Sequence, residues 1–104
     1  MLEPPNTPAL VADSVLMDRL TRRDSTALVE LERRHRGSLY AQAYGILMDA
    51  VSAERVVRDT FSQLWFAAGS IAGGRQSAWT WLRDLARELA RAEHALRTSP
   101  VSRR

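Results

Sequence analysis

The chain has 104 residues, enough for one small domain and too few for two of ordinary size. Its hydrophobic content of 45% can form a packed core, which argues against wholesale disorder. The lack of cysteine excludes a disulfide framework and cysteine-based zinc sites. No apolar run approaches the ~20 residues that span a bilayer, and the N-terminus lacks a signal-peptide layout. These features predict a cytoplasmic protein without a membrane role.

The basic charge is concentrated in the last third of the chain. Residues 75–104 hold seven arginines and three acids, whereas residues 1–74 hold eight arginines and nine acids, and lysine is absent. A local basic excess indicates an anionic partner, nucleic acid first. A solvated helix surface would carry similar charge, so both interpretations stay open.

The N-terminal part predicts a lead-in followed by a short helix. Residues 1–12 contain three prolines and no apolar periodicity, which is typical of a mobile segment. Asp13 or Ser14 can cap a helix over residues 15–22. Its expected apolar side consists of Val15, Leu16 and Leu20.

A longer helix is predicted next, capped by Asp24 or Ser25 and ending near Met48. Gly37 lies inside it and costs roughly 1 kcal/mol relative to alanine. We nevertheless expect one continuous helix, because apolar residues recur at three- and four-residue steps on both sides of the glycine. They are Leu28, Leu31, Leu39, Tyr40, Ala43, Ile46 and Leu47.

Two further helices complete the predicted domain. After a connection at residues 49–51, Ser52 is the expected cap of a helix that runs to about Ala67. A flexible glycine-bearing loop over residues 68–76 follows, and Ser77 caps a last helix that continues to about Arg97. The expected core residues of that helix are Trp81, Leu82, Leu85, Leu89 and Leu96.

The expected fold class is therefore all-α. No stretch shows the alternation of a β-strand, and no internal repeat is present. Residues 13–97 should form a small helical bundle of three long helices plus a short N-terminal helix, followed by a tail or the start of a linker at residues 98–104.

The sequence offers no constellation for catalysis. The two histidines, His35 and His94, lie far apart and have no second ligand at metal-site spacing. His35 stands among arginines and is expected at the surface. Asp84 and Glu88 lie beside helical arginines, where surface ion pairing is their default role. We therefore expect neither an enzyme nor a bound metal or cofactor.

Three blocks together resemble region two of bacterial sigma factors, best the extracytoplasmic-function group of the sigma-70 family. They are residues 27–44 (ALVELERRHRGSLYAQAY), 53–65 (AERVVRDTFSQLW) and 77–97 (SAWTWLRDLARELARAEHALR). The middle block is the most specific, because it is similar to the Ala-Glu-Asp-Val-Val-Gln-Asp-Thr-Phe run followed by Leu-Trp that is usual in the family.

The resemblance implies a helical domain that docks on the β′ clamp helices of RNA polymerase and reads the promoter −10 element. The implied polymerase-binding residues are Glu54, Arg55, Arg58, Asp59, Gln63 and Trp65. The implied DNA-binding residues are Arg75, Trp79, Trp81, Arg83, Arg87 and Arg91. Residues 68–76 match the loop that pockets an extruded base, and an anti-sigma factor is a further implied partner.

Structural roles compete with these assignments. Trp65 and Trp81 lie on apolar seams typical of a core, and Asp84 and Glu88 run beside the arginine stripe and could neutralise it. The chain also departs from the family pattern: Arg55 and Arg58 replace an acid and a glutamine. Glu88 and Ala92 are likewise unusual in the closing helix.

Family members normally carry a second domain, region four, whereas this chain stops where a linker would begin. An excised domain and a naturally short protein are both compatible with that, and Met1 favours the second. The leading hypothesis is a sigma-like domain that binds polymerase, with altered promoter recognition. The alternative is a helical interaction module or oligomer without DNA recognition.

Overall fold

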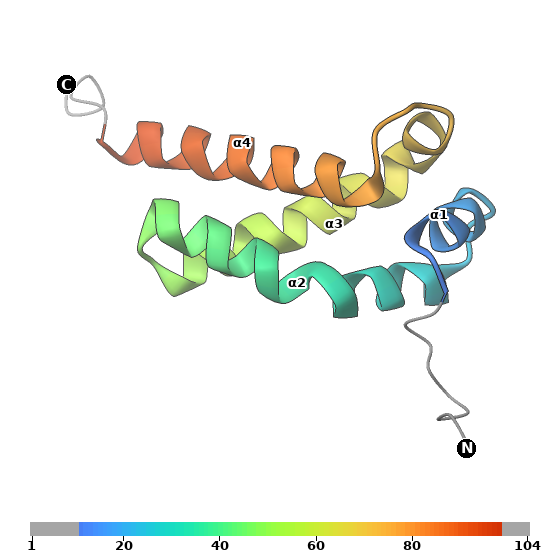
Figure 1. The fold of residues 1–104 in the computed structure, drawn as a ribbon. Helices are drawn as coiled ribbons and strands as arrows, with labels where there is room; N and C mark the ends of the chain where they lie inside the picture. The colour runs from blue at the N-terminus through green and yellow to red at the C-terminus, as the bar shows by residue number, and fades with distance from the viewer. Residues whose placement is uncertain (1–10, 99–104) are drawn as a thin grey trace, which may run out of the picture.

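The computed structural model describes residues 11–98, which form four helices and no strand (Figure 1). The helices are α1 (Asp13–Thr21), α2 (Ser25–Leu47), α3 (Ala50–Ala72) and α4 (Ala78–Thr98). The predicted all-α class, with one short and three long helices, is confirmed. Most of the predicted lead-in and tail falls outside the described residues.

Helix α1 begins earlier than predicted. Asp13 is its first residue, and the preceding Ala12 makes no side-chain cap. The predicted cap at Asp13 or Ser14 is therefore wrong; the Asp13 carboxylate instead contacts Arg34 of α2 at 2.9 Å. The buried side also differs from prediction, because Val15 is 48% exposed. The buried residues are Leu16, Met17 and Leu20.

Helix α2 follows the prediction closely. The Asp24 side chain accepts a hydrogen bond from the Thr26 N–H at 3.0 Å, as expected of an N-cap. The helix continues through Gly37 without interruption. It ends at Leu47, and the following C-cap residue, Met48, has a left-handed φ of 55° that stops the helix.

Helix α3 is longer than predicted at both ends. Asp49 is the N-cap and accepts the Ser52 N–H at 2.8 Å, so the predicted Ser52 cap is wrong and Ser52 lies buried in the first turn. The helix passes the expected end at Ala67 because Ala68 and Ile71 are buried against the bundle. The connection to α4 is thereby reduced from the predicted residues 68–76 to residues 73–77.

Helix α4 has the predicted cap but a different core seam. The Ser77 hydroxyl accepts the Thr80 N–H at 3.1 Å. Leu96, predicted to be buried, is 74% exposed because the buried seam ends at Ala90. Three other predicted core residues, Trp81, Leu85 and Leu89, are only half-buried. The fully packed positions are Ala78, Leu82, Ala86 and Ala90.

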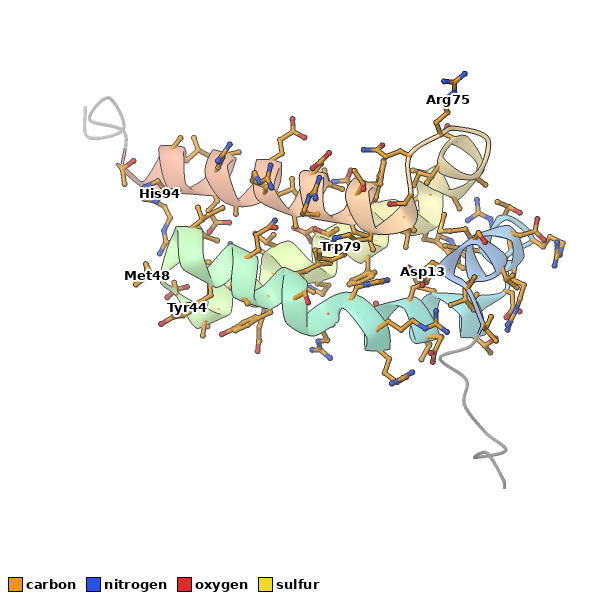
Figure 2. The ribbon with its side chains drawn as sticks, in the orientation of Figure 1. Asp13, Tyr44, Met48, Arg75, Trp79 and His94 are labelled. Atoms are coloured by element: carbon orange, nitrogen blue, oxygen red, sulfur yellow. The ribbon has the colours of Figure 1, made fainter. Side chains whose placement is uncertain are left out.

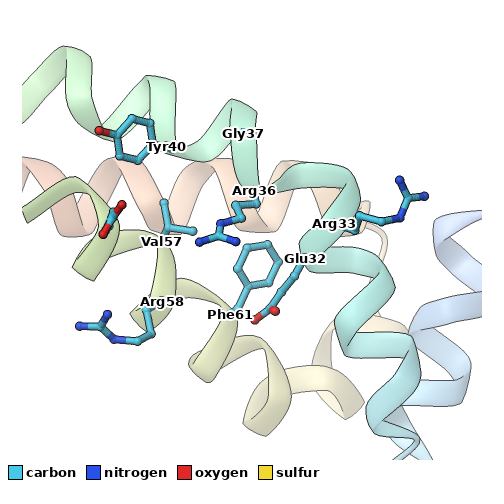
Figure 3. A pocket seen from close by; sticks show the side chains of 9 residues that line it. Glu32, Arg33, Arg36, Gly37, Tyr40, Val57, Arg58 and Phe61 are labelled. Carbon is cyan, nitrogen blue, oxygen red and sulfur yellow. The ribbon is translucent and has the colours of Figure 1, made fainter. Parts of the chain in front are cut away.

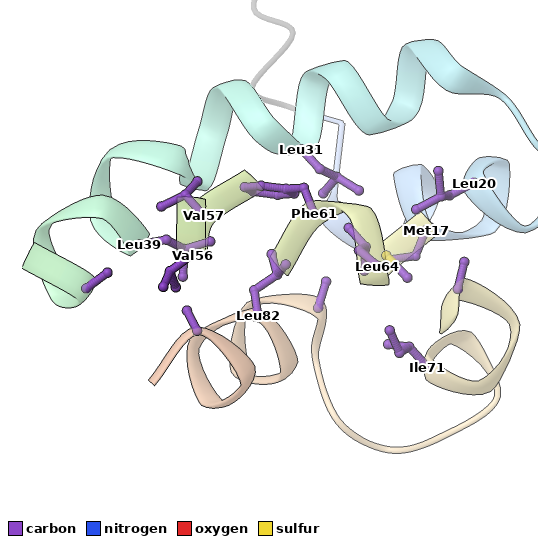
Figure 4. Packing of buried hydrophobic residues seen from close by; sticks show 14 of the residues in the cluster. Met17, Leu20, Leu31, Leu39, Val56, Val57, Phe61, Leu64, Ile71 and Leu82 are labelled. Atoms are coloured by element: carbon purple, nitrogen blue, oxygen red, sulfur yellow. The ribbon is translucent and has the colours of Figure 1, made fainter. Parts of the chain in front are cut away.

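One hydrophobic core joins all four helices (Figure 4). Phe61 and Leu64 of α3 lie at its centre, between Leu31 of α2, Leu20 of α1 and Leu82 of α4. None of the helices within residues 11–98 is long and apolar enough to cross a membrane.

Candidate functional site

A groove runs between α2 and α3 and encloses about 480 Å³ (Figure 3). Tyr40, Val57 and Phe61 supply its apolar surface. Gly37 belongs to the α2 wall, and a Cβ placed there would meet nothing within 4 Å. The glycine therefore leaves the backbone of α2 open to close approach by another molecule.

Charged side chains surround this apolar surface. Arg33 is occupied, since it pairs with Glu30 of the same helix at 2.7 Å. The other charged lining residues form no ion pair or hydrogen bond with any side chain that the structure describes. They are Glu32, Arg36, Glu54 and Arg58. An apolar strip bordered by unpaired charges of both signs can accept a side of a partner helix.

The predicted polymerase-binding residues divide between the two flanks of α3. Glu54 and Arg58 line the groove. Trp65 follows on the same flank by helical spacing and is half-buried. The Arg23 guanidinium lies 4.8 Å from the Trp65 ring centroid and donates to the Trp65 carbonyl at 2.5 Å. Part of this indole is therefore already covered by the chain itself.

Arg55 turns away from the groove toward α4. Its Nη1 donates to the Glu93 carboxylate at 2.9 Å. Asp59 and Gln63 are exposed and make no side-chain contact of this kind within residues 11–98. Phe66, which sequence reasoning missed, is 76% exposed on α3. Its position directly after Trp65, outside the apolar seam of α3, could have indicated that Phe66 is exposed.

The predicted DNA-binding aromatics do not share a face. Trp79 stacks on His35 of α2, with ring centroids 5.3 Å apart and planes inclined by 27°. Figure 2 shows Trp79 between α4 and α2. Trp81, two residues further along, points to the other side of α4 and is half-buried. Arg75 is exposed at the tip of the connection between α3 and α4.

The predicted arginine stripe of α4 is partly neutralised. Arg83 pairs with Asp84 at 3.2 Å. Arg87 and Arg91 have no ion pair among the described side chains, but they line a shallow depression together with Asp84 and Glu88. Both signs of charge therefore face a ligand that approaches this surface.

His35 is more buried than the surface position predicted for it. Its Nε2 is 2.7 Å from an Asp13 carboxylate oxygen, and only 18% of the side chain is exposed. Arg34 contacts the same carboxylate and also Glu30, each at 2.9 Å. Asp13 and Trp79 lie far from His35 in the chain, so no local pattern could have revealed this junction.

No protein-family model, no curated protein and no solved structure matches this chain. Within residues 11–98, no three His, Cys, Asp or Glu side chains are grouped so that they could hold a metal ion. The functional argument therefore depends on the groove, the exposed side of α3 and the charges of α4.

Proposed function

We propose that this chain is a sigma-like region-two domain that binds core RNA polymerase through α3 and its groove with α2. The observation that carries the proposal lies in the block that most resembles the family, residues 53–65. Its apolar side chains other than Trp65 are buried in the core. Four of its polar side chains are exposed without a partner among the described residues: Glu54, Arg58, Asp59 and Gln63.

The Arg55–Glu93 pair reduces the charge difference between this docking surface and the one that is usual in the family. Like charges brought together in an interface cost several kcal/mol. Arg55 is directed to α4 and its charge is balanced there by Glu93. Arg58 is then the main charged residue on this surface that departs from the family pattern and that a partner would meet.

A contribution to promoter −10 recognition would come from α4 and the loop before it. Arg75, Arg87 and Arg91 form no ion pair within the described part of the chain and could contact phosphates. Trp79 would have to leave His35 before it could stack on an unpaired base. We therefore propose weaker DNA recognition than polymerase binding.

A second candidate is a helical interaction module without a DNA role, with an anti-sigma factor as one kind of partner. The acids beside Arg87 and Arg91 favour it, because carboxylates repel phosphates. Salt dependence separates the two candidates. Binding to single-stranded −10-like DNA should weaken steeply as salt rises if phosphates are contacted. If the chain does not bind this DNA even at low salt, the interaction module without a DNA role is the better interpretation.

The decisive experiment measures binding of the purified chain to core RNA polymerase and to a β′ clamp-helix fragment. We expect saturable binding to both. Asp59→Arg should weaken it by about tenfold or more, as expected for a reversed charge within an interface. The matched control Asp18→Arg changes an exposed residue of α1 and should leave the affinity unchanged. A folded wild-type chain that binds neither target would exclude the proposed function.

A further inference from the structure

We infer that the groove between α2 and α3 selects a partner helix by its charge order: basic, acidic, acidic, basic. This inference rests on the proposed function, in which the helix belongs to the polymerase clamp, and it specifies the chemistry of that helix. Four side chains of this chain carry it: Glu32 and Arg36 on α2, and Glu54 and Arg58 on α3.

The charge order follows from the antiparallel packing of the two helices. They are joined by a connection of two residues, so they run in opposite directions (Figure 1). Arg36 follows Glu32 by one turn of α2, and Arg58 follows Glu54 by one turn of α3, each about 6 Å along the axis. The two glutamates therefore stand toward opposite ends of the groove, with the two arginines between them.

These charges are available to a partner. The nearby acid Glu30 of α2 already pairs with Arg33 at 2.7 Å and with Arg34 at 2.9 Å, not with Arg36. Neither Arg36 nor Arg58 has an acidic partner among the described residues. An acidic side chain of a docked helix would meet both beside an apolar floor that excludes water, where a charged hydrogen bond is stronger than in open solvent.

The matching stripe on a partner can be specified. Positions i, i+4, i+7 and i+11 lie along one side of an α-helix. Basic residues at the outer two positions would face Glu32 and Glu54, and acidic residues at the inner two would face Arg36 and Arg58. Apolar residues beside the acids would contact Tyr40, whose side chain is half-buried at the groove. The missing side chain at Gly37 allows the helix to approach closely.

The test uses two labelled helical peptides of identical composition as probes. One carries Lys, Glu, Glu, Lys at the four positions, and the other carries Glu, Lys, Lys, Glu. We expect the intact chain to bind the first at least about tenfold more tightly by fluorescence anisotropy, a difference within reach of a single charged hydrogen bond. The double variant Arg36→Glu/Arg58→Glu presents acids at all four positions and should abolish that preference, whereas Arg36→Gln/Arg58→Gln keeps the two outer glutamates and should only weaken it. The fourfold exchange Glu32→Arg/Arg36→Glu/Glu54→Arg/Arg58→Glu should reverse it.

A matched control changes the same amount of charge elsewhere. Arg22→Glu/Arg97→Glu alters two exposed arginines outside the groove and should keep the wild-type preference. Equal affinities of the wild-type chain for the two peptides, or an unchanged preference in the folded groove variants, would overturn the inference. Core polymerase gives an independent result. Polymerase binding that is insensitive to the groove variants refutes the charge order alone, whereas peptide selectivity without polymerase binding refutes the proposed function alone.

Discussion

A single arginine holds the corner between α1 and α2 against α3. Arg23 has a φ of 65°, a left-handed conformation that is unfavourable for a residue with a Cβ. Its side chain offsets this by contacting both the ring and the carbonyl of Trp65. The contact explains why Trp65, predicted for polymerase binding, is half-covered by its own chain.

The Asp24 cap predicts a specific dependence of stability on pH. Hydrogen bonds from Thr26 and Arg19 lower the pKa of the Asp24 carboxyl from 3.8 to about 2. Because the folded-state pKa lies below the unfolded one, its stabilising effect is complete above pH 3.8 and is lost as the pH falls toward 2. The unfolding free energy of the wild-type chain should therefore exceed that of Asp24→Ala by a smaller amount at pH 2 than at pH 6.

Urea titrations at several pH values measure this difference. The pKa of Glu30 is also lowered to about 2, by hydrogen bonds from Arg33 and then Arg34, and it acts in the same pH window. Its effect is present in both proteins and cancels in the comparison. Asp24→Asn, which keeps an acceptor but cannot titrate, should show a flatter difference from Asp24→Ala. A difference for wild type that is constant with pH would contradict the prediction.

At the scale of elements, tertiary contacts lengthen α3 beyond its local signals. Ile71 is only 7% exposed although it lies in the segment predicted as a loop. Ile71→Ala should lower the free energy of unfolding by about 2–3 kcal/mol, since it removes buried carbons and leaves a cavity. Ser70→Ala, at an exposed neighbour, should change it by less than about 0.5 kcal/mol. If chemical denaturation shows equally small effects for Ile71→Ala and Ser70→Ala, residues 68–72 do not belong to the core.

The buried seam of α4 consists mostly of smaller residues than its sequence pattern predicts. Of the predicted core residues, Leu82 is buried in the seam as expected, whereas Trp81, Leu85 and Leu89 are only half-buried. Ala86 and Ala90, which were not predicted, are completely buried. Alanine side chains are short, so α4 can approach its neighbours closely along this line. The larger residues, such as Trp81 and Leu89, then pack at the edges of the interface.

At the scale of the whole molecule, the shared core predicts one cooperative unfolding transition. Leu20 of the short α1 is completely buried in the cluster that also holds residues of α2, α3 and α4. Leu20→Ala should lower the unfolding free energy by about 3 kcal/mol. It should shift the transitions seen by far-ultraviolet circular dichroism and by tryptophan fluorescence equally, because all three tryptophans lie on α3 and α4.

A shift in the circular dichroism transition alone would show that α1 unfolds separately from the rest. Val15→Ala is the matched control on the same helix. Val15 is 48% exposed, so its substitution should move both transitions by much less.

Local patterns correctly indicated the number, order and type of helices, the caps at Asp24 and Ser77, and an α2 that continues through Gly37. These features depend on residues within a few positions of each other, whose spacing and hydrogen bonding are already written in the sequence. Glu54, Arg58, Asp59 and Gln63 are exposed, which agrees with the amphipathic spacing of α3.

Tertiary packing decided the rest. It brought His35 to Asp13 and Trp79, turned Arg55 to Glu93, and kept α3 helical to Ala72. It also placed the charges of α2 and α3 along one groove. Such features arise from contacts between residues distant in the chain. Their partners are set by how the helices pack, which the periodicity of a single helix does not specify.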